Sequence, residues 1–221
     1  MSYYNCIKQI NSRIQKEVCK KTIFKLNDNY LLNEYTQSKS VQSKITNINN
    51  VLTKYNIPTI NKIKITNELI DYIIPAGTKG VIKGNKFNKI VKNHILKLKL
   101  DSNRYDIQFE TKLTKINNIN EIPDWYIFDK VSKKYLIGMN QLDLWNGGHQ
   151  LNRGFKYIHY NTDNCNGNTK LNHKILCVIC NEISLKTTNN KIYTLFNKGF
   201  NDNSICYLNN LEHLVLTYFN S

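Results

Sequence analysis

The segment Ile122-Pro123-Asp124-Trp125-Tyr126-Ile127-Phe128 is followed by Asp129-Lys130-Val131-Ser132-Lys133-Lys134 and then by Tyr135-Leu136-Ile137-Gly138-Met139-Asn140-Gln141-Leu142-Asp143-Leu144. The first and third segments are rich in aromatic and branched apolar residues, which favour β-strands. The middle segment is polar and short. The stretch therefore predicts two antiparallel β-strands joined by a turn.

The register of this hairpin decides which polar side chains meet. A turn centred on Val131 and Ser132 places Asp124 opposite Met139 and diagonal to Gln141. Side chains alternate between the two faces of a strand. We therefore expect one face of the hairpin to carry Asp124, Met139, Gln141 and Asp143.

Two carboxylates and an amide gathered at the edge of a sheet suit a hard cation such as Mg²⁺, which prefers oxygen ligands. The candidate metal ligands are Asp124, Gln141 and Asp143. For Asp124 the alternative is a carboxylate that starts a strand after proline. For Asp143 it is a solvated charge at a strand end, and for Gln141 a cross-strand hydrogen bond.

The charge of the chain narrows the choice of partner. The 221 residues carry a formal net charge of +15, with 31 Lys and Arg against 16 Asp and Glu. Such a field favours a polyanion, most commonly nucleic acid. The alternative is a solvated, lysine-rich surface. In a basic protein with a magnesium site, the expected substrate is a phosphodiester.

The order of predicted elements indicates an α/β fold with a mixed sheet, flanked by helices and preceded by a helical N-terminal part. Residues 1–75 are expected to be mainly helical, with a break between two helices at 36–44, and residues 76–221 to form the α/β core. Gly80 and Gly84 predict a short connector before a helix that begins at Asn85.

Further elements are expected along the core. They are a strand at 105–110, a short helix over 149–159, strands at 174–183 and 191–196, and a final helix over 209–218.

The cysteines do not form a zinc-site pattern. Cys177 and Cys180 form one Cys-x-x-Cys pair within an apolar, strand-like segment, and no second pair lies at a suitable spacing. They are expected to be thiols buried in the core. The chain has no run of 18 apolar residues and no signal-peptide pattern, so a soluble, intracellular and cytoplasmic protein without membrane contact is expected, from a host cell or encoded by a virus.

A family resemblance rests on three groups of residues: Gly84-Asn85-Lys86-Phe87-Asn88-Lys89-Ile90-Val91, then Pro123-Asp124, then Gln141-Leu142-Asp143. Their order and placement resemble the PD-(D/E)xK nuclease superfamily, with type II restriction endonucleases as the nearest branch. The resemblance covers about residues 80–160. It implies a restriction-endonuclease-like sheet and a Mg²⁺-dependent deoxyribonuclease (a hydrolase) that acts on double-stranded DNA.

The chain departs from the pattern of this family at three positions. Asn88 stands where Glu is frequent, Gln141 where Asp or Glu is usual, and Asp143 where Lys is usual. The family's lysine stabilises charge on the phosphate or polarises the attacking water. Here Lys156 or Arg153 could supply that cation from another segment. The other reading is a catalytically inactive DNA-binding protein with the same fold.

The segment Trp145–Tyr157 follows the hairpin and is dense in groups that contact bases or phosphates. We expect Gln150 and Asn152 to contact bases, and Arg153 and Lys156 to hold the scissile strand. The alternative is an ordinary polar loop. The leading functional hypothesis is a magnesium-dependent endonuclease of a restriction system that binds a short, specific DNA site as a homodimer, because two-fold DNA sites match two-fold proteins. A nuclease specific for DNA structure rather than sequence is a third reading.

Overall fold

The computed structural model describes residues 25–114, 121–142, 156–160, 172–180 and 197–220. The chain divides into two compact units. The boundary between them lies between Lys86 and Phe87. The helix α5 (Ala76–Lys97) contains this boundary.

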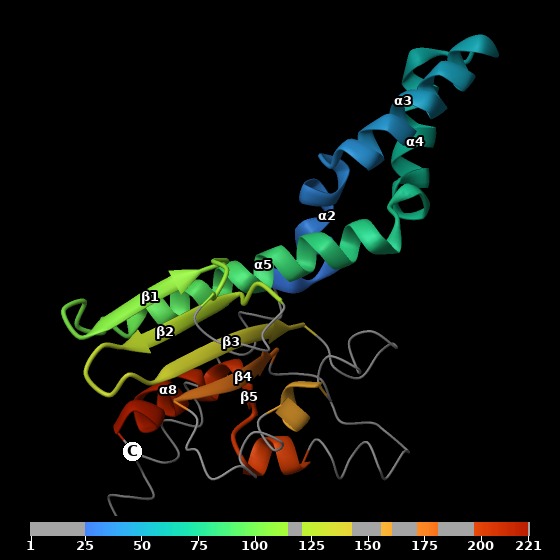
Figure 1. Cartoon of the computed structure of the whole chain (residues 1–221). Helices are drawn as coiled ribbons and strands as arrows, with labels where there is room; N and C mark the ends of the chain where they lie inside the picture. Colours follow the sequence, from blue (N-terminus) through green and yellow to red (C-terminus); the bar gives the residue numbers. More distant parts are fainter. Residues whose placement is uncertain (1–24, 115–120, 143–155, 161–171, 181–196, 221) are drawn as a thin grey trace, which may run out of the picture. The chain divides into compact units, whose positions relative to one another are not determined.

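The first unit is helical (Figure 1). It contains α2 (Asp28–Thr36), α3 (Lys39–Lys54), α4 (Thr59–Ile73) and the first part of α5. Its core consists of four buried apolar side chains, namely Leu31, Tyr35, Val41 and Ile74. Two ion pairs join α2 to α5, from Lys83 to Asp28 at 2.7 Å and from Lys86 to Glu34 at 2.6 Å.

The expectation of an N-terminal helical part is confirmed for the described residues, but two of its internal boundaries are wrong. The predicted break at 36–44 shrinks to Gln37 and Ser38, since α3 already begins at Lys39. The predicted glycine-rich connector is helix, because α5 runs from Ala76 through Gly80 and Gly84. A glycine costs a helix only about 1 kcal/mol relative to alanine, so the apolar residues that α5 buries outweigh it.

The second unit is built on a five-stranded mixed sheet, which confirms the predicted α/β class. Its strands follow the chain in the order β1 (Tyr105–Phe109), β2 (Trp125–Asp129), β3 (Tyr135–Gln141), β4 (His173–Ile179) and β5 (Ile205–Tyr207). The pairs β1–β2 and β2–β3 are antiparallel, and β3–β4 and β4–β5 are parallel.

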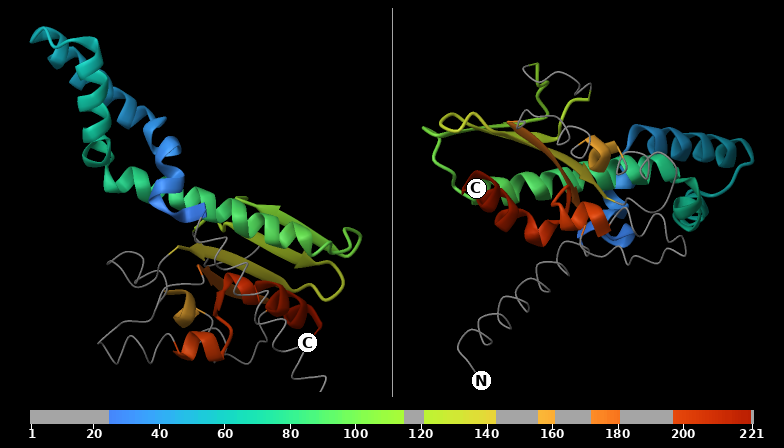
Figure 2. Two further views of the ribbon diagram at one scale, coloured as in Figure 1. Left: turned by 180° about the vertical axis from the view of Figure 1, so that it is seen from behind. Right: turned by 60° about the horizontal axis from the view of Figure 1, so that its bottom comes forward.

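Helices cover one face of this sheet. The C-terminal half of α5 and the final helix α8 (Leu211–Asn220) lie on it, as the view from behind in Figure 2 shows. The strands direct alternate residues to this face, including Trp125, Ile127, Leu136 and Leu176. The predicted final helix is confirmed, shifted by two residues and preceded by a 3₁₀ turn at Leu208–Asn210.

The opposite face carries a second apolar cluster. Ile137 and Met139 of β3, Ile175 and Cys177 of β4, and Ile205 of β5 pack there against Tyr157 and Ile158. Residues 156–160 and 197–201 are helical. The predicted short helix over 149–159 is thus observed where that segment is described, while the predicted strand at 191–196 lies outside the described residues.

Cys177, Cys180 and Cys206 are buried thiols that form no disulfide, as expected for core cysteines. No helix within the described ranges is long and apolar enough to cross a membrane.

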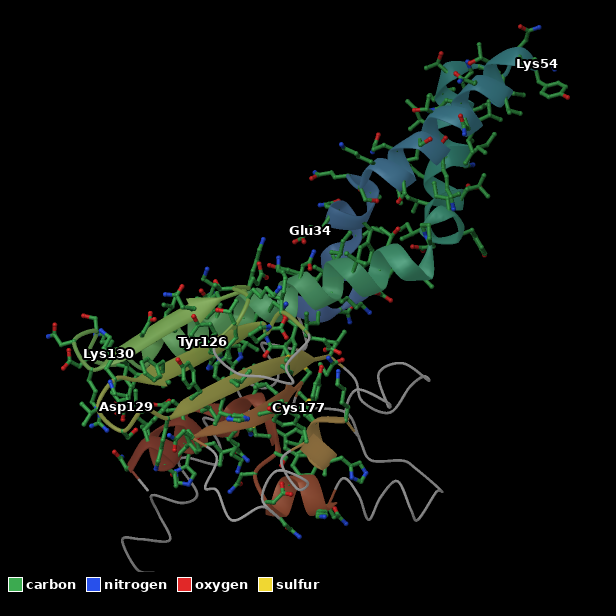
Figure 3. The ribbon with its side chains drawn as sticks, in the orientation of Figure 1. Glu34, Lys54, Tyr126, Asp129, Lys130 and Cys177 are labelled. Atoms are coloured by element: carbon green, nitrogen blue, oxygen red, sulfur yellow. The ribbon has the colours of Figure 1, made fainter. Side chains whose placement is uncertain are left out.

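The turn of the β2–β3 hairpin is fixed by a buried carboxylate, that of Asp129, which is labelled in Figure 3. Arg104 donates to Asp129 from Nε and from Nη2, the latter at 2.7 Å. The main-chain amide of Val131 and the hydroxyl of Ser132 donate to the same carboxylate at 2.9 Å. These donors, Arg104 first, hold the pKa of Asp129 well below its usual range.

The Gly80→Ala substitution tests whether α5 is one continuous helix. A Cβ atom at Gly80 would meet no atom within 4 Å, so alanine should stabilise the helix by about 0.5–1 kcal/mol. Gly138→Ala is the matched control, because its Cβ would lie 1.8 Å from Trp125 and must destabilise the sheet. Thermal unfolding followed by circular dichroism measures both, and a lower midpoint for Gly80→Ala would contradict a continuous helix.

The Asp129→Asn substitution tests the carboxylate at the turn. The pKa of Asp129 is depressed in the folded state, so its stabilisation is complete above the ordinary Asp pKa of about 3.9 and declines as the pH falls below it. We expect the variant to lose about 1–3 kcal/mol of unfolding free energy at pH 7, because buried donors lose an acceptor. Urea unfolding should show this difference shrinking as the pH falls from 4 to 2. A difference that stays constant over this range would exclude the ion pair as its source.

Candidate functional site

The hairpin has the register that the sequence predicts. Trp125 pairs with Gly138 and Phe128 with Tyr135, which centres the turn on Val131 and Ser132. Asp124 immediately precedes β2, and its main-chain amide donates to Gly138 O at 3.1 Å. The lysines of the turn, Lys130 among them, lie at the far end of the hairpin from Asp124 (Figure 3).

Asp124 is the end point of a chain of side-chain hydrogen bonds. Trp125 Nε1 donates to Asn140 Oδ1 at 3.1 Å. Asn140 Nδ2 donates to Asn88 Oδ1 at 3.1 Å, and Asn88 Nδ2 donates to Asp124 Oδ1 at 2.8 Å. The second carboxylate oxygen, Asp124 Oδ2, accepts from the main-chain amide of Asn140 at 2.6 Å.

The donor and acceptor roles in this series of hydrogen bonds follow from the chemistry of its side chains. An indole N–H can only donate, so Asn140 must turn its amide oxygen toward Trp125 and its NH₂ group toward Asn88. Asn88 must then accept on one side and donate on the other. The group at position 124 therefore has to accept from two donors, which an ionised carboxylate does with both oxygens.

This chain of hydrogen bonds requires a side chain at position 88 that both donates and accepts. A glutamate at position 88 would offer only acceptors, so it could not donate to Asp124, and two carboxylates would repel each other. An asparagine both donates and accepts. Asn88 and Asn140 are thus the residues that position Asp124, and the sequence interpretation identified neither of them as a site residue.

Gln141 is the second predicted ligand that the structure describes. It pairs with Ile179 of β4 and lies on the same face of β3 as Met139, as expected. Only 8% of it is exposed.

Asp124 also acts electrostatically on Cys177 of β4. Burial raises the pKa of the Cys177 thiol well above its usual range, and the nearby Cys206 and Asp124 add to that rise. Cys177 pairs with Met139, two residues before Gln141. The carboxylate thus contacts the α5 side of the sheet through Asn88, whereas Gln141 lies on the opposite face with Met139, so the expectation that Asp124 and Gln141 share one face is wrong.

Lys156 lies at the Asp124 end of the hairpin. Its Nζ contacts Glu121 Oε1 at 2.8 Å, and Tyr157 OH donates to Glu121 Oε2 at 3.2 Å. Glu121 stands three positions before Asp124 and was not among the predicted site residues. Its place just before the Pro123-Asp124 pair is the one sequence signal that could have identified it.

The other predicted residues, Asp143, Gln150, Asn152 and Arg153, lie outside the described residues. Within the part of the chain that is described, no three His, Cys, Asp or Glu side chains are grouped so that they could hold a metal ion. The described candidate site therefore consists of Asp124 and Gln141, with Asn88, Asn140, Glu121 and Lys156 around them.

Neither a protein-family model nor a curated protein sequence matches this chain. Its function is therefore inferred from the arrangement of the site and from the charge of the chain.

Proposed function

We propose that the protein is a Mg²⁺-dependent endodeoxyribonuclease that hydrolyses phosphodiester bonds of double-stranded DNA at a short, specific site. The observation that carries this proposal is the Asp124 carboxylate at the start of the hairpin, which Asn88 and the main-chain amide of Asn140 hold in one orientation in a chain of net charge +15. A carboxylate held in one orientation is a suitable ligand for a hard cation, which prefers oxygen atoms.

The atoms that could bind a metal ion at this site are oxygens, which magnesium prefers. Asp124 and Gln141 offer oxygen atoms, and Asp143 would add another by the sequence argument. An ionised carboxylate has about four lone-pair sites, so the oxygens of Asp124 can accept hydrogen bonds and bind a metal ion together. A bound Mg²⁺ ion would supply charge neutralisation at the phosphate oxygens and a more acidic water.

The protein's own residues would have distinct roles. Asn88 and the main-chain amide of Asn140 hold the Asp124 carboxylate in one orientation. Lys156 would supply the positive charge that the residue at position 143 lacks. Its side chain is 54% exposed and is held by Glu121, so it is anchored near the site without being buried.

The partner class follows from charge. The net charge of +15 favours a polyanion, and electrostatic attraction to phosphates provides most of the nonspecific affinity for DNA. Specific recognition would come from Gln150, Asn152 and Arg153 and would involve a homodimer on a two-fold DNA site. These three residues are proposed from the sequence alone.

The second candidate is a catalytically inactive DNA-binding protein. Two observations favour it. No cluster of three acidic or metal-binding side chains lies within the described ranges, and both Asp124 oxygens already accept hydrogen bonds. On this reading Asp124 serves to join α5 to the hairpin, and its charge has no chemical role.

The Gln141→Met substitution separates the two candidates. Methionine has a similar size and shape, so the variant is expected to fold at this buried position. If Gln141 binds the metal, cleavage of unmethylated plasmid DNA in Mg²⁺ should fall by about 100-fold or more, as it does when a group that stabilises charge at a reaction centre is removed.

Asp124→Asn should also abolish cleavage, while DNA binding is kept or strengthened because repulsion of phosphate is lost. Its stability should fall by about 1–3 kcal/mol, since an amide has one acceptor for two donors. Asp71→Asn, an exposed site on α4, is the control for charge. Wild-type cleavage by Gln141→Met and Asp124→Asn would refute the proposed metal site. No cleavage by the wild-type protein with Mg²⁺ would favour the inactive DNA-binding protein.

A further inference from the structure

A second polar site lies on the sheet face opposite α5, toward the turn of the hairpin. A cavity of about 80 Å³ lies between β1, β2 and β3. Its lining is formed by Asp106, Lys112, Leu113, Thr114, Tyr126, Phe128 and Tyr135. Tyr126 is labelled in Figure 3. The sequence motifs assign no role to this group, and the proposed metal site uses none of these residues.

Three aromatic rings form the apolar part of the cavity. Phe128 and Tyr135 are stacked with their ring centres 4.4 Å apart, and Tyr126 is tilted against Tyr135 at 6.1 Å. All three side chains are half-buried, so part of each ring surface remains open. Half-open aromatic rings on a sheet are the usual platform on which unpaired bases stack, since every base has a flat π-face.

The polar groups of the cavity include both signs of charge. Asp106 Oδ1 accepts from Gln108 Nε2 at 2.7 Å, and its Oδ2 has no partner within the described residues. Lys112 Nζ likewise forms no ion pair or hydrogen bond there, although it lines the same cavity as Asp106. Burial raises the pKa values of Tyr126 and Tyr135, and the Asp106 charge adds to both, which places this carboxylate near the two rings.

We propose that this cavity binds an unpaired guanine base of single-stranded DNA, stacked on Tyr126 and edge-on to Tyr135, whose plane is inclined by 55° to that of Tyr126. Asp106 accepts from N1–H and the N2 amino group of guanine, and Lys112 donates to O6 or N7. Guanine is the base that offers two adjacent donors and two adjacent acceptors on separate parts of its edge. Adenine offers one amino group and would leave the carboxylate with less to accept.

Charge complementarity supports a nucleic acid over other ligands for this cavity. A cationic amine would be drawn to Asp106 and to the aromatic rings but repelled by Lys112. Next to the cavity, Lys133 Nζ lies 5.9 Å from the centre of the Phe128 ring, where it can meet the phosphate beside a stacked base. The nucleic-acid partner is shared with the proposed function, whereas the choice of an unpaired guanine rests on the cavity.

The test measures binding of fluorescein-labelled single strands to the full chain by anisotropy, with EDTA present so that no cleavage contributes. One oligonucleotide is a thymidine tract with a single central guanine, and the second carries adenine at that position. The guanine strand should bind at least about fivefold more tightly, the lower end of the range for a two-bond base contact. Inosine, which lacks the N2 amino group, should give an intermediate affinity.

Asp106→Asn should make the two strands bind equally, because an amide cannot accept from both guanine donors. Lys112→Ala should weaken the guanine strand more than the adenine strand. Asp71→Asn and Lys97→Ala, both exposed and outside the cavity, remove the same charges and should leave the preference unchanged. Asp106 is half-buried and its replacement has the same shape, so the variant is expected to fold.

Equal affinity of the wild type for both strands would overturn the proposal, as would a guanine preference that survives in Asp106→Asn. If GMP displaces the strand at a concentration far below the oligonucleotide's own dissociation constant, the cavity binds a free guanine nucleotide. That result would overturn the single-strand assignment. If a cavity variant loses the guanine preference but still cleaves plasmid DNA, the proposed nuclease function is unaffected. Loss of cleavage in the metal-site variants would leave this cavity unaffected.

Discussion

The donor-only indole of Trp125 is the constraint on which the candidate site depends. Because it can only donate, it fixes the orientation of Asn140, which fixes that of Asn88, and the chain must end on a double acceptor at Asp124. The carboxylate thereby joins α5 to β2 and β3 at one point. A low-dielectric interior strengthens such a hydrogen-bond network only if every member has its partner. Removing one of these residues is therefore expected to weaken the whole network.

The sheet itself makes room for this arrangement. The indole of Trp125 lies over Gly138, and a Cβ atom at that position would come within 1.8 Å of the ring. Trp125 is 1% exposed, so its packing holds the start of β2 against β3 where the hydrogen-bond chain begins. The Arg104–Asp129 pair fixes the other end of β2. Between these two anchors the strand presents Tyr126 and Phe128 to the opposite face, where the proposed base cavity lies.

The local features were predictable from the sequence, and the long-range ones were not. Alternation and a symmetric turn gave the register that pairs Trp125 with Gly138, because both signals lie within one hairpin. The bond from Asn88 to Asp124 spans 36 positions, and no local pattern encodes it. The glycines of α5 were given too much weight as helix breakers, and β5 was missed because three residues carry no measurable period.

The most direct test of the site is a Mn²⁺ titration of ¹⁵N-labelled protein that follows the indole N–H resonance of Trp125, assigned by comparison with Trp145→Phe. Trp125 Nε1 bonds to Asn140, whose main-chain amide bonds to Asp124, so a paramagnetic ion held by Asp124 and Gln141 lies close to this proton. We expect saturable broadening at low Mn²⁺ that Mg²⁺ reverses and that Gln141→Met weakens. An indole resonance that stays sharp in the wild type, or that broadens equally in the variant, would contradict a metal site at Asp124 and Gln141.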